Sequence, residues 1–325
     1  MPLSQYNPDS IGSDAWWLRG TRGARVFDKC LLYLLKVIYR GVRFSLRIVL
    51  GKKRRDKLYR QRGLNFKDFL YKSIRALGIG NSMLLEFSVP KYDYKVSCPI
   101  NKEDFIVMTK HEDEIIELFT AKEGDVVIDV GAHMGRYTII SSKRVGQNGR
   151  VMAIEAHPDN FEILNRNIKL NKLTNVIPLN YAVYSKETKL RLYLPDEELG
   201  YTMHHSTMLN YVSTKYKIET EGKYVEVNAN TLDNLLLQQQ QKQKQNGISH
   251  ADINWIKIDV EGAELEVLKG ATDILSKSKD IALLIEVHGK DNYKPIVEFL
   301  KMYNFKIEFE KTYDREEKHI LVRKS

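Results

Sequence analysis

The chain of 325 residues is long enough for one large α/β domain with an appendage, and its hydrophobic content of 43% is ordinary for a globular protein. Its two cysteines, Cys30 and Cys98, suggest neither a disulfide framework nor a zinc site, which fits a reducing compartment. The net charge of +9 belongs to residues 1–62, where 15 Lys and Arg stand against 4 Asp and Glu (net +11), whereas the remaining chain has 36 against 38 (net −2). This uneven distribution argues against nucleic-acid binding across the whole fold.

The N-terminal arm, residues 1–62, differs in composition from the rest. Residues 1–25 do not resemble a secretory signal, because no small-residue cleavage site follows a short apolar core. The pattern of residues 26–50 predicts a helix with a wide apolar face and one basic stripe, followed by a basic cluster at residues 52–62. The stripe consists of Lys29, Lys36, Arg40, Arg43 and Arg47. This combination is typical of a helix in the interface of an anionic membrane, and it predicts a peripheral protein on the cytoplasmic side.

Other interpretations of this arm stay open. The apolar face of residues 26–50 could pack on the rest of the fold or in a dimer, as most amphipathic helices do. A transmembrane span is disfavoured, because Lys36, Arg40 and Arg43 would lie near the bilayer centre. The basic cluster could touch RNA, but no aromatic-interleaved nucleic-acid module accompanies it, so no nucleic-acid partner is expected.

Residues 63–120 form a lead-in segment. In this segment we expect a helix over residues 66–77, strands over 84–89 and 93–98, a short strand over 105–108, and a helix over 112–120.

The most informative stretch is residues 126–138. Its unbroken apolar run is typical of a strand buried on both faces of a parallel sheet, and glycine-containing turn chemistry and a helix start follow. Gly131 and Gly135 let the backbone approach a ligand closely. A dinucleotide site needs G-x-G-x-x-G at this turn, and the spacing here differs, which disfavours a dehydrogenase. The stretch therefore predicts a cofactor site of another kind.

Two later strands bring polar residues to the same edge of the sheet. After the glycine loop we expect alternating helices and strands over residues 135–145, 150–155, 159–171 and 176–179. Glu155 then stands at a strand end, where an acid can accept both ribose hydroxyls of an adenosine. Asn180 stands at the next strand end, where its side chain could reach an adenine amino group.

Residues 186–230 are expected to be an insertion with two strands around a polar loop. The pair His204 and His205 in this loop lacks further metal ligands at suitable spacing, so a surface or substrate-facing pair is the better interpretation. A helix over residues 231–237 follows, and the Gln-rich residues 238–246 are expected to be a solvated low-complexity excursion.

The last part of the chain continues the alternation of strands and helices. Strands over residues 255–260 and 281–287 end in Asp259 and Glu261, and in Glu286 and His288, respectively. A helix over residues 293–302 and two antiparallel strands, over residues 305–309 and 319–322, close the chain. The whole pattern predicts an α/β fold with a doubly wound sheet.

These residues resemble the FkbM family of S-adenosylmethionine-dependent methyltransferases over roughly residues 105–310. The resemblance is carried by residues 127–132, by Leu164, Asn167, Asn171 and Asn175, by Ala182 and Val183, and by residues 231–233, 257–264 and 285–288. The Asp-Val-Glu-Gly block within residues 257–264 is more specific than the glycine loop.

The resemblance implies an O-methyltransferase of the class I, Rossmann-like fold, often acting on sugar or polyketide hydroxyls, with S-adenosylmethionine as cofactor. Carried over by position, Asp129, Gly131, Ala132 and Gly135 would hold the methionine part, Glu155 the ribose and Asn180 the adenine end, while His133, Tyr137, Ala156 and Ala182 would complete the cofactor site. The chain departs from the family at His133, where Asn is usual, at Arg136, where an aromatic residue is common, and at Ala156 and His157, where Pro and Asn are usual.

Methyl transfer from a sulfonium is an in-line displacement, so the enzyme must align the acceptor oxygen with the methyl group and exclude water. An alcohol also needs a base within hydrogen-bond reach. The candidates are Asp259, Glu261, Glu286 and His288, and we expect His288 or Asp259 to accept the proton while Glu261 positions the acceptor. Asp259 and Glu261 could also bind Mg²⁺, but the sequence shows no complete metal site.

The sequence thus predicts three parts: the basic arm of residues 1–62, the lead-in of residues 63–120, and a methyltransferase domain of residues 121–325 with a β-hairpin insertion. The predicted function is methylation of a hydroxyl of a sugar or glycan precursor near an anionic membrane surface. The alternative is a non-catalytic, membrane-docked adaptor with a methyltransferase-like scaffold, against which the glycine loop and Glu155 argue.

Overall fold

The computed structural model describes residues 84–99, 107–109, 113–193, 224–242, 248–313 and 317–325, and the chain divides into two units, Met1–Ile106 and Val107–Ser325. In the first unit the described residues form an antiparallel hairpin of β1 (Leu84–Val89) and β2 (Tyr94–Pro99). The turn between them is the short helix η4 (Pro90–Tyr92), which Pro90 opens and which Asp93 ends in the left-handed region at φ 49°. Both predicted strands are confirmed.

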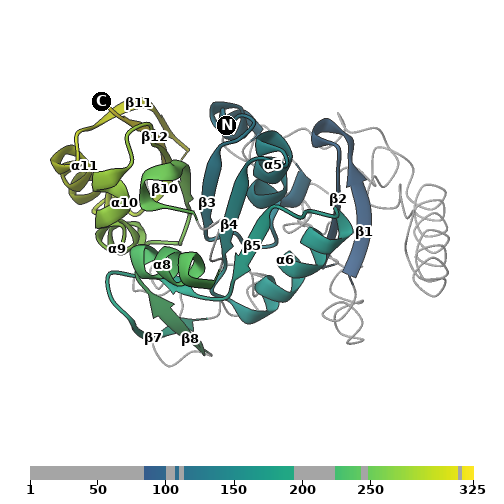
Figure 1. Ribbon diagram of the computed structural model, residues 1–325. Helices are drawn as coiled ribbons and strands as arrows, with labels where there is room; N and C mark the ends of the chain where they lie inside the picture. Colours follow the sequence, from purple (N-terminus) through teal and green to yellow (C-terminus); the bar gives the residue numbers. More distant parts are fainter. Residues whose placement is uncertain (1–83, 100–106, 110–112, 194–223, 243–247, 314–316) are drawn as a thin grey trace, which may run out of the picture. The chain divides into compact units, whose positions relative to one another are not determined.

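The second unit is built on a seven-stranded sheet in the order β11-β12-β10-β9-β3-β4-β5 (Figure 1). The strands are β3 (Val126–Val130), β4 (Arg150–Ile154), β5 (Val176–Leu179), β9 (Ile253–Ile258), β10 (Ala282–His288), β11 (Phe305–Thr312) and β12 (Glu317–Lys324). Five strands, from β5 to β10, are parallel, and β12 and β11 are added antiparallel at one edge. The predicted doubly wound sheet is confirmed.

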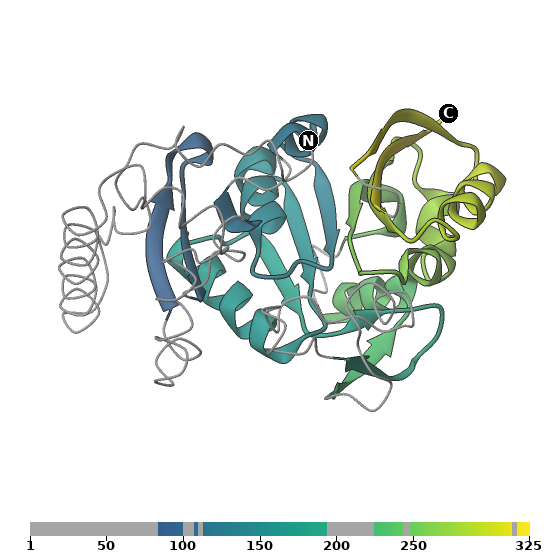
Figure 2. The ribbon, with the colours of Figure 1, turned by 180° about the vertical axis from the view of Figure 1, so that it is seen from behind.

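Helices flank both halves of this sheet, as the two opposite views show (Figures 1 and 2). They are α4 (Asp113–Leu118), α5 (Arg136–Val145), α6 (Pro158–Leu170), α8 (Leu232–Lys242), α9 (Glu264–Lys269), α10 (Thr272–Lys277) and α11 (Tyr293–Met302), with a short helix η6 (His250–Asp252). Helices α5 and α6 contact β3, β4 and β5, while α9 and α11 contact β10 and β11. Because layers cover both faces, central strands such as β10 are buried along their whole length.

The insertion after β5 contributes a small sheet of its own. It consists of β6 (Ala182–Val183), β7 (Thr188–Tyr193) and β8 (Tyr224–Asn230), in the order β6-β8-β7. The strands β7 and β8 pair antiparallel as the predicted hairpin. The loop with His204 and His205 lies outside the described residues.

Several helical features depart from the sequence prediction. Helix α8 continues through the Gln-rich segment to Lys242 instead of ending at residue 237, so the predicted excursion is wrong for residues 238–242. The reason is that Leu232, Leu235 and Leu236 form a buried stripe, and Gln239, one heptad after Leu232, is also buried. In addition, Val107 and Met108 are helical, where the sequence predicted a strand over residues 105–108.

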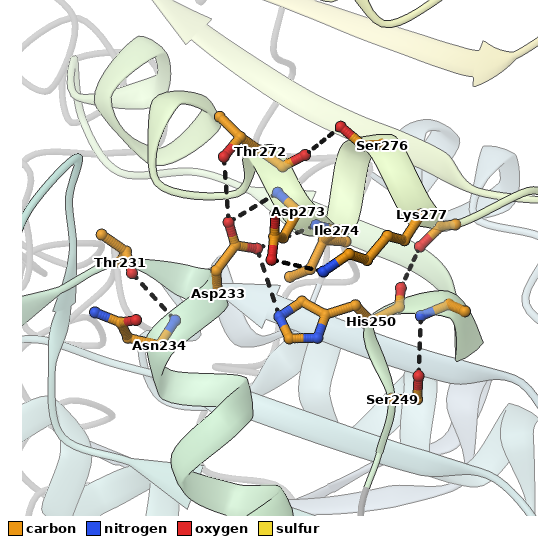
Figure 3. Close-up of polar contacts among 12 residues, drawn as sticks. Thr231, Asp233, Asn234, Ser249, His250, Thr272, Asp273, Ile274, Ser276 and Lys277 are labelled. Atoms are coloured by element: carbon orange, nitrogen blue, oxygen red, sulfur yellow. Dashed lines mark hydrogen bonds and ion pairs between the residues drawn. The ribbon is translucent and has the colours of Figure 1, made fainter.

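Helix α10, which the sequence did not predict, begins where a side chain from another helix caps it (Figure 3). Asp233 on α8 accepts the backbone N–H groups of Asp273 and Ile274, at 2.9 and 3.1 Å, and the Thr272 hydroxyl at 3.5 Å. A carboxylate at a helix N-terminus satisfies amides that have no partner within the helix. Part of the family-like motif at residues 231–233 is therefore structural.

Within the described residues, no helix is long and apolar enough to cross a membrane. The helices predicted over residues 26–50 and 66–77 lie outside the part of the chain that the structure describes.

Candidate functional site

A cavity opens at the carboxyl ends of β3, β4 and β9 in the second unit. This is the edge at which open α/β sheets bind ligands. The predicted site residues that line it are Asp129, Gly131, Ala132, His133, Tyr137, Glu155, Ala156, Ala182, Asp259, Glu261 and Glu286. Gly135, Asn180 and His288 do not line it. The tertiary structure thus brings most of the candidate cofactor residues and three of the four candidate catalytic residues to one cavity.

The loop after β3 lies directly against the loop after β9. Gly131 has φ +78°, and a Cβ added there would lie 1.8 Å from the backbone oxygen of Asp259. The N–H groups of Gly131 and Ala132 both donate to the oxygen of Ile154 at 3.0 Å, which fixes the same loop to β4. Only glycine permits this approach, so the first glycine of the loop is explained by backbone contact.

Asp129 carries a buried carboxylate with incomplete hydrogen bonding. Its Oδ2 accepts the Thr138 hydroxyl at 2.6 Å, while its buried Oδ1 has no hydrogen-bond partner among the described residues. Burial raises the pKa of Asp129 above its ordinary value, and the positive charge of Lys257 partly opposes this. An unmet carboxylate oxygen at the edge of a cavity is suited to accept an N–H group or an ammonium of a bound cofactor.

Glu155 joins the loops after β3 and β4. Its Oε2 accepts the N–H of His133 and its Oε1 accepts the N–H of His157, each at 2.8 Å. Burial raises the pKa of Glu155 to about 7, although these backbone donors act in the opposite direction. The side chain of Asn160 is a further donor to this carboxylate, which still has acceptor capacity for a ribose hydroxyl.

Asn180 supports this loop from the side. Its amide Nδ2 donates to the backbone oxygens of Glu155 and Ala156, at 2.8 and 3.1 Å. The Asn180 side chain therefore holds the loop after β4, and its donors are directed at the backbone and not toward the cavity.

Gly135, at φ +97°, precedes the first residue of α5.

Lys257 is a member of the cavity wall that the sequence analysis did not single out. Its ammonium lies 2.8 Å from Asp259 Oδ2 and 4.8 Å from the centre of the Tyr137 ring. The sequence did contain a signal for it, namely a lysine inside an otherwise apolar strand. A buried lysine requires a charged or polar partner, so such a lysine indicates a polar site. This ion pair fixes one carboxylate oxygen of Asp259, a residue that also lines the cavity.

Arg136 is a second cationic residue of the wall. Its Nη2 lies 2.6 Å from Asp113 Oδ1 and its Nη1 donates to the backbone oxygen of Val107 at 3.0 Å. The Arg136 side chain is 5% exposed and Asp113 is partly exposed, so at this departure from the family pattern a half-buried ion pair connects α5 to α4.

His288 lies behind the cavity wall, inside a group of carboxylates. Its Nδ1 is 2.9 Å from Glu264 Oε1, and its Nε2 is 3.5 Å from both Glu261 Oε2 and Glu286 Oε1. Burial by itself would lower the pKa of His288, but these three carboxylates hold it well above its usual range. Both ring nitrogens thus face carboxylates of the protein, so this geometry does not support His288 as the residue that accepts a proton from the acceptor.

Glu286 connects this group to β12. Its Oε2 lies 3.3 Å from His319 Nε2. Burial alone would raise the pKa of Glu286, yet the imidazoles of His319 and His288 hold it well below its usual range. Neither Glu264 nor His319 was predicted as a site residue, because each depends on contacts between segments that are distant in the sequence.

Two residues of the cavity wall have backbone conformations that are unusual for residues other than glycine. His133 and Glu261 both have φ +52°. The left-handed region costs an ordinary residue about 1–2 kcal/mol. Strain of this kind is concentrated at functional sites. Asn, the usual family residue at position 133, tolerates the left-handed region better than His does.

The strand order, with its antiparallel addition at one edge, and the cavity at the glycine loop define a class I methyltransferase that uses S-adenosylmethionine. A family model described as "Methyltransferase FkbM domain" matches residues 129–307, which is more than half of the chain, and the protein belongs to this family. A second model, for protein-L-isoaspartate(D-aspartate) O-methyltransferase, matches residues 59–182.

Among the similar proteins, "Hexuronic acid methyltransferase AglP" of Haloferax volcanii is 28% identical over 215 residues, covering 66% of this chain and 77% of the relative. "Methyltransferase 1" of Beauveria bassiana is 23% identical over 181 residues, covering 54% and 67%. The crystal structure of a methyltransferase FkbM from Methylobacillus flagellatus superposes with a TM-score of 0.40 at 15% identity, covering 62% of this chain and 44% of that one. The predictions of family, enzyme class and cofactor are confirmed, which favours the methyltransferase over the non-catalytic adaptor.

Proposed function

We propose that this methyltransferase acts on a hydroxyl of a sugar or glycan precursor. The observation that carries the proposal is the acidic end of the cavity, where Asp259, Glu261 and Glu286 line the wall at the ends of β9 and β10. Hydrogen-bond acceptors in such a cluster suit an acceptor with several hydroxyls. The hexuronic acid methyltransferase from Haloferax volcanii supports the choice of a sugar.

The cofactor would lie along the loops after β3 and β4. The residues present fit it, because Gly131 keeps the loop free of a Cβ, Asp129 has an unmet buried oxygen, and Glu155 stands at the strand end suited to ribose. When bound, S-adenosylmethionine supplies an electrophilic methyl group on a sulfonium. The protein's own contribution is to hold the cofactor, orient the acceptor oxygen and exclude water.

The proton of the acceptor hydroxyl would pass to a carboxylate of the acidic end. Asp259 and Glu261 both line the cavity, and the ion pair with Lys257 holds Asp259 in place. A positioned carboxylate is an accepted general base for such a transfer. This assignment replaces His288, which lies behind these groups.

The first test is calorimetric titration of the full-length protein with S-adenosylmethionine, followed by methyl transfer from radiolabelled cofactor to glycosides of neutral sugars and of uronic acids. We expect saturable cofactor binding and labelled sugar. Mild alkali then distinguishes the products, because a methyl ether survives it and a methyl ester is hydrolysed. Cofactor binding with no labelled sugar, or label that mild alkali releases, would overturn the hydroxyl assignment.

Peripheral membrane association is the second part of this proposal. Its support is the sequence of residues 26–62, with an apolar face, a basic stripe and a basic cluster. A full-length variant with Lys52, Lys53, Arg54 and Arg55 changed to Gln removes four charges, each worth about 1 kcal/mol at an anionic surface. Co-sedimentation with phosphatidylserine vesicles should fall at least tenfold relative to the wild type. Equal sedimentation of the two proteins would refute membrane binding through this cluster.

A further inference from the structure

The ends of β9 and β10 bring together three side chains with the chemistry of metal ligands. Asp259, Glu286 and His288 each offer one ligand atom, and these atoms all lie within 4.8 Å of one another. The two strands are parallel neighbours, so their carboxyl ends meet at the same edge of the sheet. The sequence showed the two halves of this group separately, and the fold joins them.

The distances around His288 Nε2 fit a shared cation. Nε2 lies 3.5 Å from a carboxylate oxygen of Glu261 and 3.5 Å from one of Glu286, which is long for a hydrogen bond. Ligands at about 2.1 Å from a tetrahedral metal ion are separated by about 3.4 Å from each other. Both carboxylate oxygens therefore lie at the distance from Nε2 that neighbouring ligands of one ion have.

Two further residues contact the proposed ligands from the side away from the ion, as hydrogen-bonding residues around a metal site commonly do. Glu264 Oε1 lies 2.9 Å from the Nδ1 of His288, so the Nε2 of this ring is directed at the other carboxylates. A carboxylate on the second ring nitrogen is the usual support of a metal-binding histidine. His319, 3.3 Å from the Oε2 of Glu286, similarly fixes the other oxygen of that ligand.

The charge of the group also calls for a cation. Glu264 is fully buried, and its Oε2 has no hydrogen-bond partner among the described residues. Asp259, Glu261 and Glu286 add three more carboxylates, which the ammonium of Lys257 and the imidazoles of His288 and His319 face. Buried and half-buried carboxylates that converge in this way are stabilised when they coordinate a metal.

We propose that Asp259, Glu261, Glu286 and His288 form a divalent cation site at the acidic end of the cavity, with Mn²⁺ or Zn²⁺ as the occupant. One imidazole with several carboxylates suits these ions better than Mg²⁺, which prefers oxygen ligands alone. Because three of the ligands line the cavity, the ion would be open to a ligand from that side. If the proposed function holds, this ligand is a pair of acceptor oxygens, such as a vicinal diol or a hydroxy-carboxylate of a sugar.

The experiment is titration of the full-length protein, first stripped with a chelator, with MnCl₂, ZnCl₂ and MgCl₂ in separate calorimetric runs. No cofactor or acceptor is added, so the result is independent of the proposed methylation of sugars. We expect one Mn²⁺ or Zn²⁺ per chain, with Mg²⁺ at least tenfold weaker. Absence of binding by Mn²⁺ and Zn²⁺ at millimolar concentration would overturn the site and leave a network of proton-sharing groups.

Three variants locate the ion. Glu261→Gln removes a ligand that is partly exposed, and it should weaken binding at least tenfold. Glu264→Gln keeps the side-chain volume and an oxygen acceptor but removes the charge behind His288, and loss of such an outer group weakens metal affinity by about 10–100-fold. Glu298→Gln, on the exposed face of α11, is the matched control and should bind as the wild type does. Circular dichroism checks folding, and unchanged affinity in both folded site variants would overturn the proposal.

Discussion

The contact between the loops after β3 and β9 can be tested by adding one methyl group. Gly131→Ala introduces a Cβ that would lie 1.8 Å from the backbone oxygen of Asp259, in a residue with φ +78°. Gly124→Ala is a matched control, because Gly124 has a similar φ of +89° and no atom within 4 Å of the added Cβ. The pair separates backbone strain from steric overlap.

The expected magnitudes follow from these two environments. In both variants alanine must adopt the left-handed region, which costs about 1–2 kcal/mol, while the stiffer unfolded chain returns about 0.4–1 kcal/mol. We therefore expect Gly124→Ala to lower the free energy of unfolding by about 1 kcal/mol. In Gly131→Ala the overlap is with backbone, which cannot rotate away, and overpacking adds typically 1–3 kcal/mol, for a total of about 2–4 kcal/mol.

Urea unfolding followed by circular dichroism measures the free energy of unfolding, and calorimetric titration with S-adenosylmethionine measures the affinity for the cofactor. Gly131→Ala should also lose cofactor affinity at least tenfold, because the shift separates two loops that line the cavity. Gly124→Ala should bind as the wild type does. Equal destabilisation of the two variants, or wild-type affinity in Gly131→Ala, would refute the close approach of these loops as the reason for the glycine.

Three further predictions address single side chains. Asp129→Asn removes a buried charge and keeps the shape of the side chain. Calorimetry should show at least a tenfold loss of S-adenosylmethionine affinity, while the free energy of unfolding stays within about 1 kcal/mol of the wild type. Full affinity would exclude Asp129 from the cofactor site. Because burial raises the pKa of Glu155 from 4.5 to about 7, the folded state binds this proton more tightly than the unfolded chain. The stability it contributes is present below pH 4.5 and is lost as the pH rises to about 7, with a slope of up to about 1.4 kcal/mol per pH unit. In Glu155→Gln, unfolding measured across this range should lack that decline, and an unchanged slope would contradict the shift. Asp233→Ala should cost about 1–2 kcal/mol by urea unfolding, because α10 loses its cap, while a change in cofactor affinity would show that its role is not confined to the helix.

Much of the fold could be predicted because the signals are local. A parallel sheet covered on both faces requires mostly apolar runs, and β3, β9 and β10 each carry such a run in a few consecutive residues. The roles of Gly131 and Glu155 were also predictable, because a strand end that binds a cofactor needs a backbone without a Cβ and an acceptor for the ribose hydroxyls. These features were predicted from spacing alone, and the structure places both residues on the cavity wall.

The errors of prediction arose where a partner from elsewhere in the chain decides the outcome. The buried stripe of α8 carries the helix through a glutamine run whose composition predicted a solvated loop, and α10 begins because Asp233 reaches it across 40 residues. Composition describes a residue's own preference, whereas burial depends on what packs against it.

The sequence by itself determined the class of this protein: the strand-loop-helix unit with Gly131, the acid at Glu155, and the acidic block after β9 that leads to Asp259 and Glu261. Only the tertiary structure decided which groups meet. It placed His288 behind the cavity between Glu264 and Glu261, and it joined the ends of β9 and β10 into one cluster of ligands. The physical reason is that backbone periodicity and turn chemistry act over a few residues, whereas ion pairs and shared ligands form between strands that only the completed sheet brings side by side.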